Sequence, residues 1–167
     1  MRASTTRAPS DTQNRLNRAR LALRLAEERT GLRDSAALTV QRALPAALSA
    51  WQGSGVLTLQ GSTTVLLAAL ALRQGATGWC GVIGGDELGW CAATEVGLDL
   101  NRVLTVPTSL LDDASTPTVT AALLDGVDVL LIGAPVAERL RPQHRRRLLA
   151  RARERGRLIL TPARWEG

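Results

Sequence analysis

From Val56 onward, the chain alternates between short apolar runs and longer segments with helical spacing. The apolar runs predict strands at 55–60, 79–84, 102–107, 127–133 and 157–161, and the spacing between them predicts helices at 63–74, 87–96, 117–125 and about 142–155. Strands that are apolar on both faces are typical of a sheet covered by helices on both sides. The pattern therefore predicts an α/β fold, in which helices sandwich a parallel sheet of about five strands.

The residues before this alternating region follow a different pattern. Small polar residues and Pro9 predict a disordered N-terminus over 1–10. Residues 11–54 are interpreted as an N-terminal basic helix, which Ser10 or Asp11 would cap, and a connector with a helical piece near 46–51. The truncated α/β core then occupies 55–167 and carries an Arg-rich helix near its end.

Charge divides the chain into three parts. All 21 basic residues are arginine, and the formal net charge is +6. Residues 1–34 carry eight arginines and residues 136–167 carry ten, whereas the stretch between them carries three arginines against eight acidic residues. A mildly acidic core between two basic arms indicates contact with a polyanion or an acidic partner at the ends.

Several functional classes are disfavoured by composition. The longest apolar run, Val65 to Leu72, is too short to span a bilayer, and the N-terminus lacks the apolar core of a secretory signal, so we expect no membrane association. Cys80, Cys91 and the single His144 lack zinc-site spacing, and we expect two reduced thiols and no metal. Phe and Tyr are absent and only four Trp occur, so platforms for base stacking are scarce.

The segment from Gly55 to Thr64 has the strand, turn and helix start of a phosphate-binding unit. A working unit needs a glycine-rich loop of about eight residues that ends in Gly-Lys-Ser/Thr. Here the loop is too short and the lysine is missing. We interpret these positions as a degenerate nucleotide-binding site and expect no cofactor, although a helix N-terminus can hold a stray anion; the residues are Gly61, Ser62, Thr63 and Thr64.

The order of the segments resembles the RecA recombinase core. Beside the Walker A-like turn at 55–64, the similar segments are Trp79-Cys80-Gly81-Val82-Ile83, the stretch from Glu95 to Leu104, the Walker B-like strand from Gly126 to Ile132, and Arg157-Leu158-Ile159-Leu160. The resemblance implies the sheet order 3-2-4-5-1, with Val56 to Gln60 at one edge. Because an exposed edge strand invites pairing, we expect the N-terminal segment or a partner to cover that edge.

The departures from RecA fall on its catalytic groups. Gly133 stands where the Walker B strand of RecA ends in a metal-binding aspartate. Asp86 and Glu87 lie near the position of the RecA catalytic glutamate, but we interpret them as an N-terminal cap and first-turn acid of the predicted 87–96 helix. RecA-like proteins often pack an N-terminal helix on a neighbouring subunit; here Leu16, Leu23 and Ala26 would form that seam or cover the domain's own sheet.

A small RecA-like protein with degenerate motifs, basic ends and exclusive use of arginine resembles the ImuA-type accessory proteins of the bacterial mutasome, particularly the actinobacterial form. The resemblance implies a non-catalytic adaptor in SOS-induced translesion synthesis, cytoplasmic and associated with the nucleoid after DNA damage. The implied partners are ImuB, a catalytically inactive Y-family polymerase relative, and an error-prone replicative-type polymerase. The alternative is an ATP-independent DNA-binding or recombinase-regulating protein; a weak ATPase is a third, less favoured hypothesis.

The predicted 142–155 helix is the strongest candidate for a contact surface. Leu148, Leu149 and Ala152 form a narrow apolar stripe, while arginines occupy more than half of the circumference. Arginine pairs bidentately with phosphate or carboxylate, so three interpretations stay open: a solvated helix, a DNA contact, or docking on an acidic partner. The candidate residues are Arg145, which lies near the apolar stripe, and Arg146, Arg147, Arg151, Arg153 and Arg155.

Overall fold

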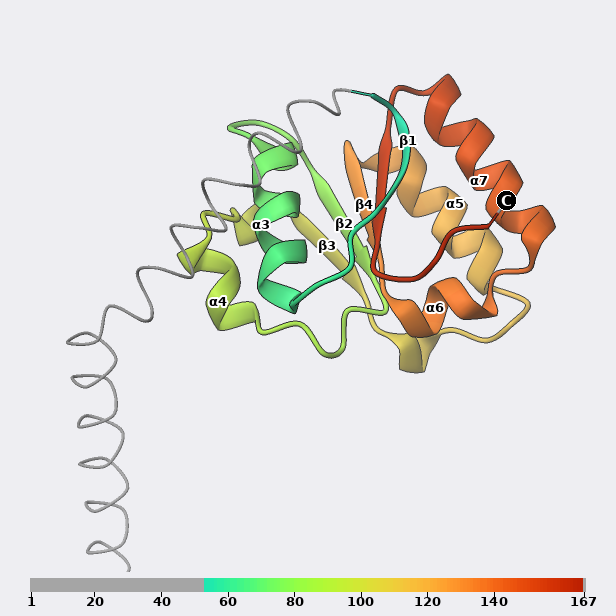
Figure 1. The fold of residues 1–167 in the computed structure, drawn as a ribbon, viewed down its shortest axis with the longest axis horizontal. Helices are drawn as coiled ribbons and strands as arrows, with labels where there is room; N and C mark the ends of the chain where they lie inside the picture. The colour runs from blue at the N-terminus through green and yellow to red at the C-terminus, as the bar shows by residue number, and fades with distance from the viewer. Residues whose placement is uncertain (1–52, 167) are drawn as a thin grey trace, which may run out of the picture. The chain divides into compact units, whose positions relative to one another are not determined.

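The computed structural model describes residues 53–166, and a five-stranded parallel sheet forms the centre of this part of the chain (Figure 1). The sheet order is β1-β5-β4-β2-β3, and every neighbouring pair is parallel. This is the predicted order with the first strand at an edge, so the fold prediction is confirmed. The strands are β1 Gly55–Thr58, β2 Cys80–Ile83, β3 Val103–Val106, β4 Val129–Ile132 and β5 Leu158–Thr161.

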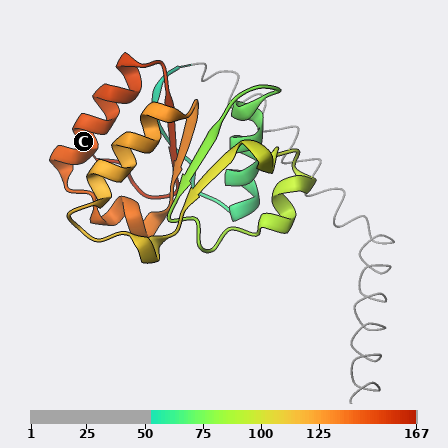
Figure 2. The same ribbon diagram turned by 180° about the vertical axis from the view of Figure 1, so that it is seen from behind.

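Helices cover both faces of the sheet. Figure 1 shows α3 and α4 over one face, and the reverse view in Figure 2 shows α5, α6 and α7 over the other. Short 3₁₀ turns, η1 Leu100–Arg102 and η2 Thr108–Leu110, flank β3. The helices are α3 Thr63–Gln74, α4 Trp90–Glu95, α5 Thr116–Gly126, α6 Ala134–Arg139 and α7 Pro142–Glu154.

The expectations for the N-terminal part lie outside the described residues. They concern the disordered segment 1–10, the basic helix and connector over 11–54, and the seam of Leu16, Leu23 and Ala26. The proposed cover of the β1 edge by the N-terminal segment belongs to the same group and stays a prediction.

Burial explains why the apolar runs form the inner strands. Every residue of β2, β4 and β5 is buried, whereas the edge strands β1 and β3 are partly exposed. α3 packs on β4 and β5, while α5 packs on β2 and β4, and α7 packs on β1 and β5. On the α5 and α7 side, Leu124 and Leu148 join Leu130, Ile132 and Ile159 in one buried cluster. Side chains alternate between the faces of a strand, so these runs supply both layers of the core.

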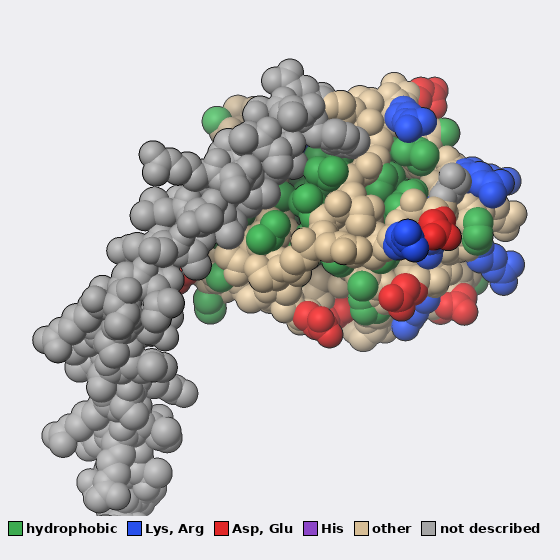
Figure 3. All heavy atoms as spheres, in the orientation of Figure 1, with side chains coloured by type: hydrophobic (Ala, Val, Ile, Leu, Met, Phe, Trp, Pro, Cys, Tyr) green, Lys and Arg blue, Asp and Glu red, His purple; other side chains and the backbone are tan. Residues whose placement is uncertain are grey.

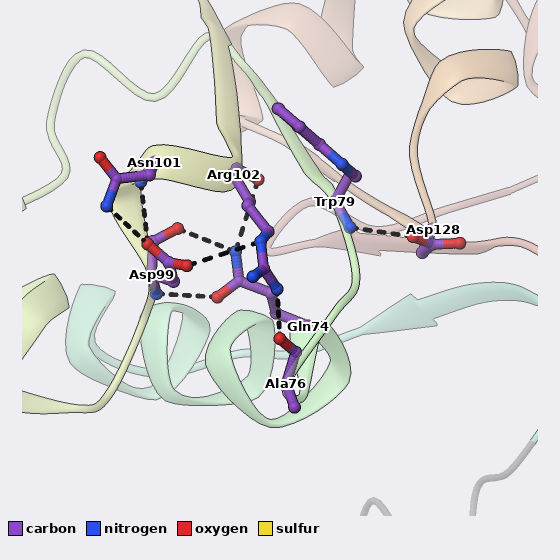
Figure 4. A network of polar contacts seen from close by, with 7 residues as sticks. All are labelled: Gln74, Ala76, Trp79, Asp99, Asn101, Arg102 and Asp128. Atoms are coloured by element: carbon purple, nitrogen blue, oxygen red, sulfur yellow. Dashed lines mark hydrogen bonds and ion pairs between the residues drawn. The ribbon is translucent and has the colours of Figure 1, made fainter.

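A network of polar contacts anchors the segment that precedes β3, at the end of the sheet where β2, β3 and β4 begin (Figure 4). The Gln74 side chain is buried, and its Nε2 donates to the Asp99 carbonyl (2.9 Å) while its Oε1 accepts from the Asp99 N–H (2.8 Å). Nearby, the Trp79 N–H donates to the Asp128 carboxylate (2.9 Å). The two Gln74 bonds satisfy a buried amide and tie the end of α3 to the segment before β3, whereas the Trp79 bond joins the residues that precede β2 and β4.

Two helix predictions need correction. The helix predicted to begin at residue 87 begins at Trp90 with Gly89 as its N-cap, because residues 84–89 form turns after β2. Asp86 and Glu87 are therefore neither its cap nor its first-turn acids. The short helix α6 was not predicted, since a six-residue segment carries too little periodicity; Gly133 is its N-cap, and a proline occupies its first turn.

Candidate functional site

The strand order creates a crevice between β2 and β4. The connection after β2 runs through α4 on one face, and the connection after β4 runs through α6 on the other, although the two strands are neighbours. Such a topological switch point, at the carboxyl ends of the strands, is where ligands bind in open α/β sheets. A pocket of about 260 Å³ lies here, and its lining includes Thr63, Asp86, Glu87, Thr108 and Gly133.

The turn from β1 to α3 contributes little to this pocket. Gly61, Ser62 and Thr63 are exposed and Thr64 is half-buried, but only Thr63 lines the pocket. Ser62 is the N-cap of α3, and its side chain makes no capping hydrogen bond. The structure therefore brings one of the four predicted nucleotide-site residues to the switch point and leaves the other three outside it.

Gly133 lies where β4 leaves the sheet, directly against the end of β2. Its N–H donates to the Ile83 carbonyl (2.8 Å), and a Cβ added at this position would collide with the backbone oxygen of Gly84. Gly84 has a φ of +68°, a conformation that favours glycine. An aspartate side chain at position 133, as in a Walker B strand, does not fit this backbone.

Asp86 has a structural partner. Its carboxylate accepts hydrogen bonds from the Thr108 hydroxyl and from the Thr108 N–H (3.1 Å), and these bonds lower the pKa of Asp86. The contact ties the turn after β2 to η2, which follows β3. Glu87 is exposed at the mouth of the pocket. The pocket is thus small, with leucine and proline side chains in its lining and a carboxylate that is already hydrogen-bonded.

Arg145 is half-buried and hydrogen-bonded to the backbone of the chain. Its Nη2 and Nε donate to the carbonyls of Ala137 (2.8 Å) and Leu140 (3.0 Å), while Nη1 donates to the carbonyl of Arg164 (3.3 Å). Its guanidinium also lies 5.8 Å from the ring centre of Trp165. Arg145 therefore connects α7 to the end of α6 and to the C-terminal segment, and its donors face the chain itself.

Arg151 and Arg155 are paired with α5. Arg151 Nε donates to Asp125 Oδ1 (2.6 Å), and Arg155 Nε lies 3.1 Å from the same oxygen. Hydrogen bonding to Arg151 lowers the pKa of Asp125, and the charges of both arginines act in the same direction. These two predicted contact residues hold α7 against α5.

The other three candidates present their charge outward. Arg146, Arg147 and Arg153 are exposed, and none forms an ion pair with a described residue. Figure 3 shows basic side chains over the α7 side of the molecule, interspersed with acidic ones. The six predicted arginines thus comprise three that stabilise the fold and three that are available for contacts.

Sequence reasoning missed a groove between α5 and α7. It has a volume of about 860 Å³, and small residues of α5 form part of its lining. Arg147 and Arg151 line it from α7, together with residues that the prediction did not select: Asp113, Asp125, Arg139, Arg141 and His144. The arginines of α7 and the small residues of α5 were visible in the sequence, but only the helix packing brings them together.

Two possible classes of site are not found in the described part of the chain. Within residues 53–166, no group of three or more His, Cys, Asp or Glu residues is placed to hold a metal ion. In the same range, none of the helices has the length and apolarity needed to cross a membrane. Cys80 is a core side chain, and its burial raises the pKa of the thiol to about 12.

Comparison with known proteins places this α/β domain in a family. A family model described as the MT3502 N-terminal domain matches residues 42–167, and the chain belongs to that family. It is 33% identical to the uncharacterized protein Rv3395c of Mycobacterium tuberculosis over 110 residues, which are 65% of this chain and 52% of that protein. The chain thus spans about half the length of this curated relative.

A solved structure was also found. The crystal structure of SulA from Pseudomonas aeruginosa is similar with a TM-score of 0.48 and 19% sequence identity, over 64% of this chain and 93% of that one.

Proposed function

We propose that this protein is a non-catalytic adaptor that supports SOS-induced translesion DNA synthesis by binding a polymerase-like partner. The observation that carries the proposal is that the switch-point pocket lacks the groups that nucleotide hydrolysis requires. The turn before α3 lacks a lysine, Gly133 leaves no room for a metal-binding aspartate, and the Asp86 carboxylate is bonded to Thr108. Phosphoryl transfer depends on the groups that are missing here.

The partner is inferred from the resemblance to ImuA-type proteins together with the arginine surface. The strand order matches that expected for a RecA-like core, and the family has a mycobacterial relative. An adaptor of this type would bind an ImuB-like Y-family polymerase relative and, through it, an error-prone polymerase. Arg146, Arg147 and Arg153 are exposed and free of ion pairs with described residues, which supports a protein contact through α7.

The same three arginines favour one alternative function, ATP-independent DNA binding that regulates a recombinase. Guanidinium groups on an exposed helix bind phosphates as readily as carboxylates. The alternative differs from the adaptor in its salt dependence, because each phosphate contact releases counterions.

The adaptor proposal is tested in cells of the source organism after ultraviolet irradiation. Deletion of the gene should abolish damage-induced mutation to the same extent as deletion of the ImuB-like gene, and the double deletion should add nothing further. The wild-type gene and a Glu87→Gln variant should both restore mutagenesis, since no chemistry is assigned to the pocket. Normal induced mutagenesis in the deletion strain would overturn the proposal.

A further inference from the structure

The groove between α5 and α7 combines a floor of small side chains with a rim of arginines. Pro117 and Thr118 lie one turn before Ala121 and Ala122, so the four residues share one face of α5. Leu148 of α7 is buried at the base of the same groove. Because the α5 side chains are short, the two helices leave the space between them open.

The charges of the rim do not cancel. Of the two acidic residues in the lining, Asp125 is already paired with Arg151 and Arg155. Arg141 and Arg147 are exposed and have no ion pair with a described residue, while Arg139 donates one N–H to the Leu111 carbonyl (3.2 Å). Only Asp113 remains to balance these guanidinium groups, so the rim is left with a positive charge.

His144 also lines the groove. It lies three and four residues before Arg147 and Leu148, and therefore on the same face of α7. Its side chain is half-buried, and its Nδ1 atom is shielded from solvent and so does not face the groove.

We infer that this groove docks an acidic, amphipathic segment of the partner protein, with its carboxylates on Arg141 and Arg147 and an apolar side chain on the Ala121 and Leu148 floor. An apolar centre with arginine at its rim is the usual anatomy of a protein interface. Duplex DNA fits less well, since its sugar-phosphate backbone offers no apolar side chain for the floor. The inference rests on the proposed adaptor function and locates its contact.

The test uses a fluorescein-labelled, four-turn amphipathic peptide with glutamates on one face and leucines on the other, measured by fluorescence anisotropy with the full chain. The wild-type protein should bind it, and Arg147→Glu or Arg141→Glu should weaken binding at least tenfold, since each removes a charge-assisted pair. Arg146→Glu is the matched control: it lies next to Arg147 outside the groove lining and should change affinity less than threefold. Filling the floor with Ala121→Trp should also weaken binding.

Three kinds of result would overturn the inference. The first is a failure of charge-dependent binding: either the acidic peptide does not bind, or a peptide with glutamine in place of glutamate binds equally well. The second is an equal effect of Arg146→Glu and Arg147→Glu, since that would place the contact on the outer face of α7. The third is displacement of the labelled peptide by unlabelled duplex DNA, which would show that the groove binds phosphates. The test contains no polymerase, so its failure is distinct from failure of the mutagenesis experiment.

Discussion

A single glycine determines much of the chemistry that the switch-point pocket can support. Gly133 directly follows β4 and lies against the backbone of Gly84, where there is no space for a Cβ. In a Walker B strand, an aspartate at the equivalent position holds the metal ion. The backbone at Gly133 leaves no space for a side chain, so packing as well as sequence excludes a carboxylate at this position.

Gly133→Ala should therefore destabilise the protein. The added methyl group forces β2 and β4 apart, and overpacking of this kind costs roughly 1–3 kcal/mol of the free energy of unfolding. Gly126→Ala is the control, because a Cβ at that position meets nothing within 4 Å; its effect should be within about 0.5 kcal/mol. Urea denaturation of both variants gives the comparison, and equal stabilities would contradict this account of Gly133.

Arg145 was predicted as a contact residue, but its hydrogen bonds give it a structural role. It donates to three carbonyls, from α6, the residue after it and the C-terminal segment. Lysine cannot reproduce this planar arrangement of donors. Arg145→Lys should lower the free energy of unfolding by about 1–2 kcal/mol, while the neighbouring exposed Arg146→Lys should be nearly neutral. A neutral Arg145→Lys would show that these hydrogen bonds add nothing to stability.

At the scale of elements, α7 is held by its ion pairs to α5. The Asp125 carboxylate forms ion pairs with Arg151 and Arg155, and these contacts lower its pKa. A carboxyl whose pKa is lower in the folded than in the unfolded protein stabilises the fold above its unfolded pKa. This stability is lost as the pH falls through the lower, folded-state pKa.

Asp125→Asn should therefore lower the thermal midpoint at pH 7 and reduce its dependence on pH below about 4, where unfolded aspartates titrate. Asp113→Asn is the matched control, since Asp113 is exposed and forms no ion pair with a described residue. Thermal unfolding followed by circular dichroism from pH 7 to pH 3 measures both effects. An Asp125→Asn curve parallel to that of the wild type would contradict the assigned role of this pair.

The elements also show what the sequence was able to predict. Continuous apolar runs such as 129–132 identified all five strands, and the resemblance to RecA supplied their order. The short helix α6 was missed because six residues carry little periodicity. The roles of Asp86 and Asp125 were not predictable, since each depends on a partner far along the chain: Thr108 for the first, and Arg151 and Arg155 for the second.

At the scale of the whole molecule, two regions of the described chain differ in what they offer a ligand. The switch-point pocket has no lysine in its lining, no space for an aspartate at position 133, and an Asp86 carboxylate that is bonded to Thr108. The α5 and α7 side carries the exposed arginines and the open groove. We propose the adaptor function on the basis of this arrangement, in which the exposed arginines and the open groove are available to a partner.

Hydrolysis of ATP should accordingly not exceed the rate without protein. The chain has no lysine, and charge stabilisation by the loop lysine and Mg²⁺ is the main source of phosphoryl-transfer catalysis. A steady-state assay with purified protein checks this, and Glu87→Gln serves as the variant. Hydrolysis that is above background in the wild type and is lost in this variant would place a catalytic carboxylate in the pocket.

The most direct test compares partner binding with DNA binding in one triple variant, Arg146→Gln, Arg147→Gln and Arg153→Gln. The account predicts that the variant loses co-purification with the ImuB-like protein, while DNA affinity, already weak for want of stacking aromatics, stays nearly unchanged. The contradicting result is tight DNA binding by the wild type at physiological salt, lost in the variant. Such binding would fall with salt at a log–log slope near −0.9 per phosphate contact.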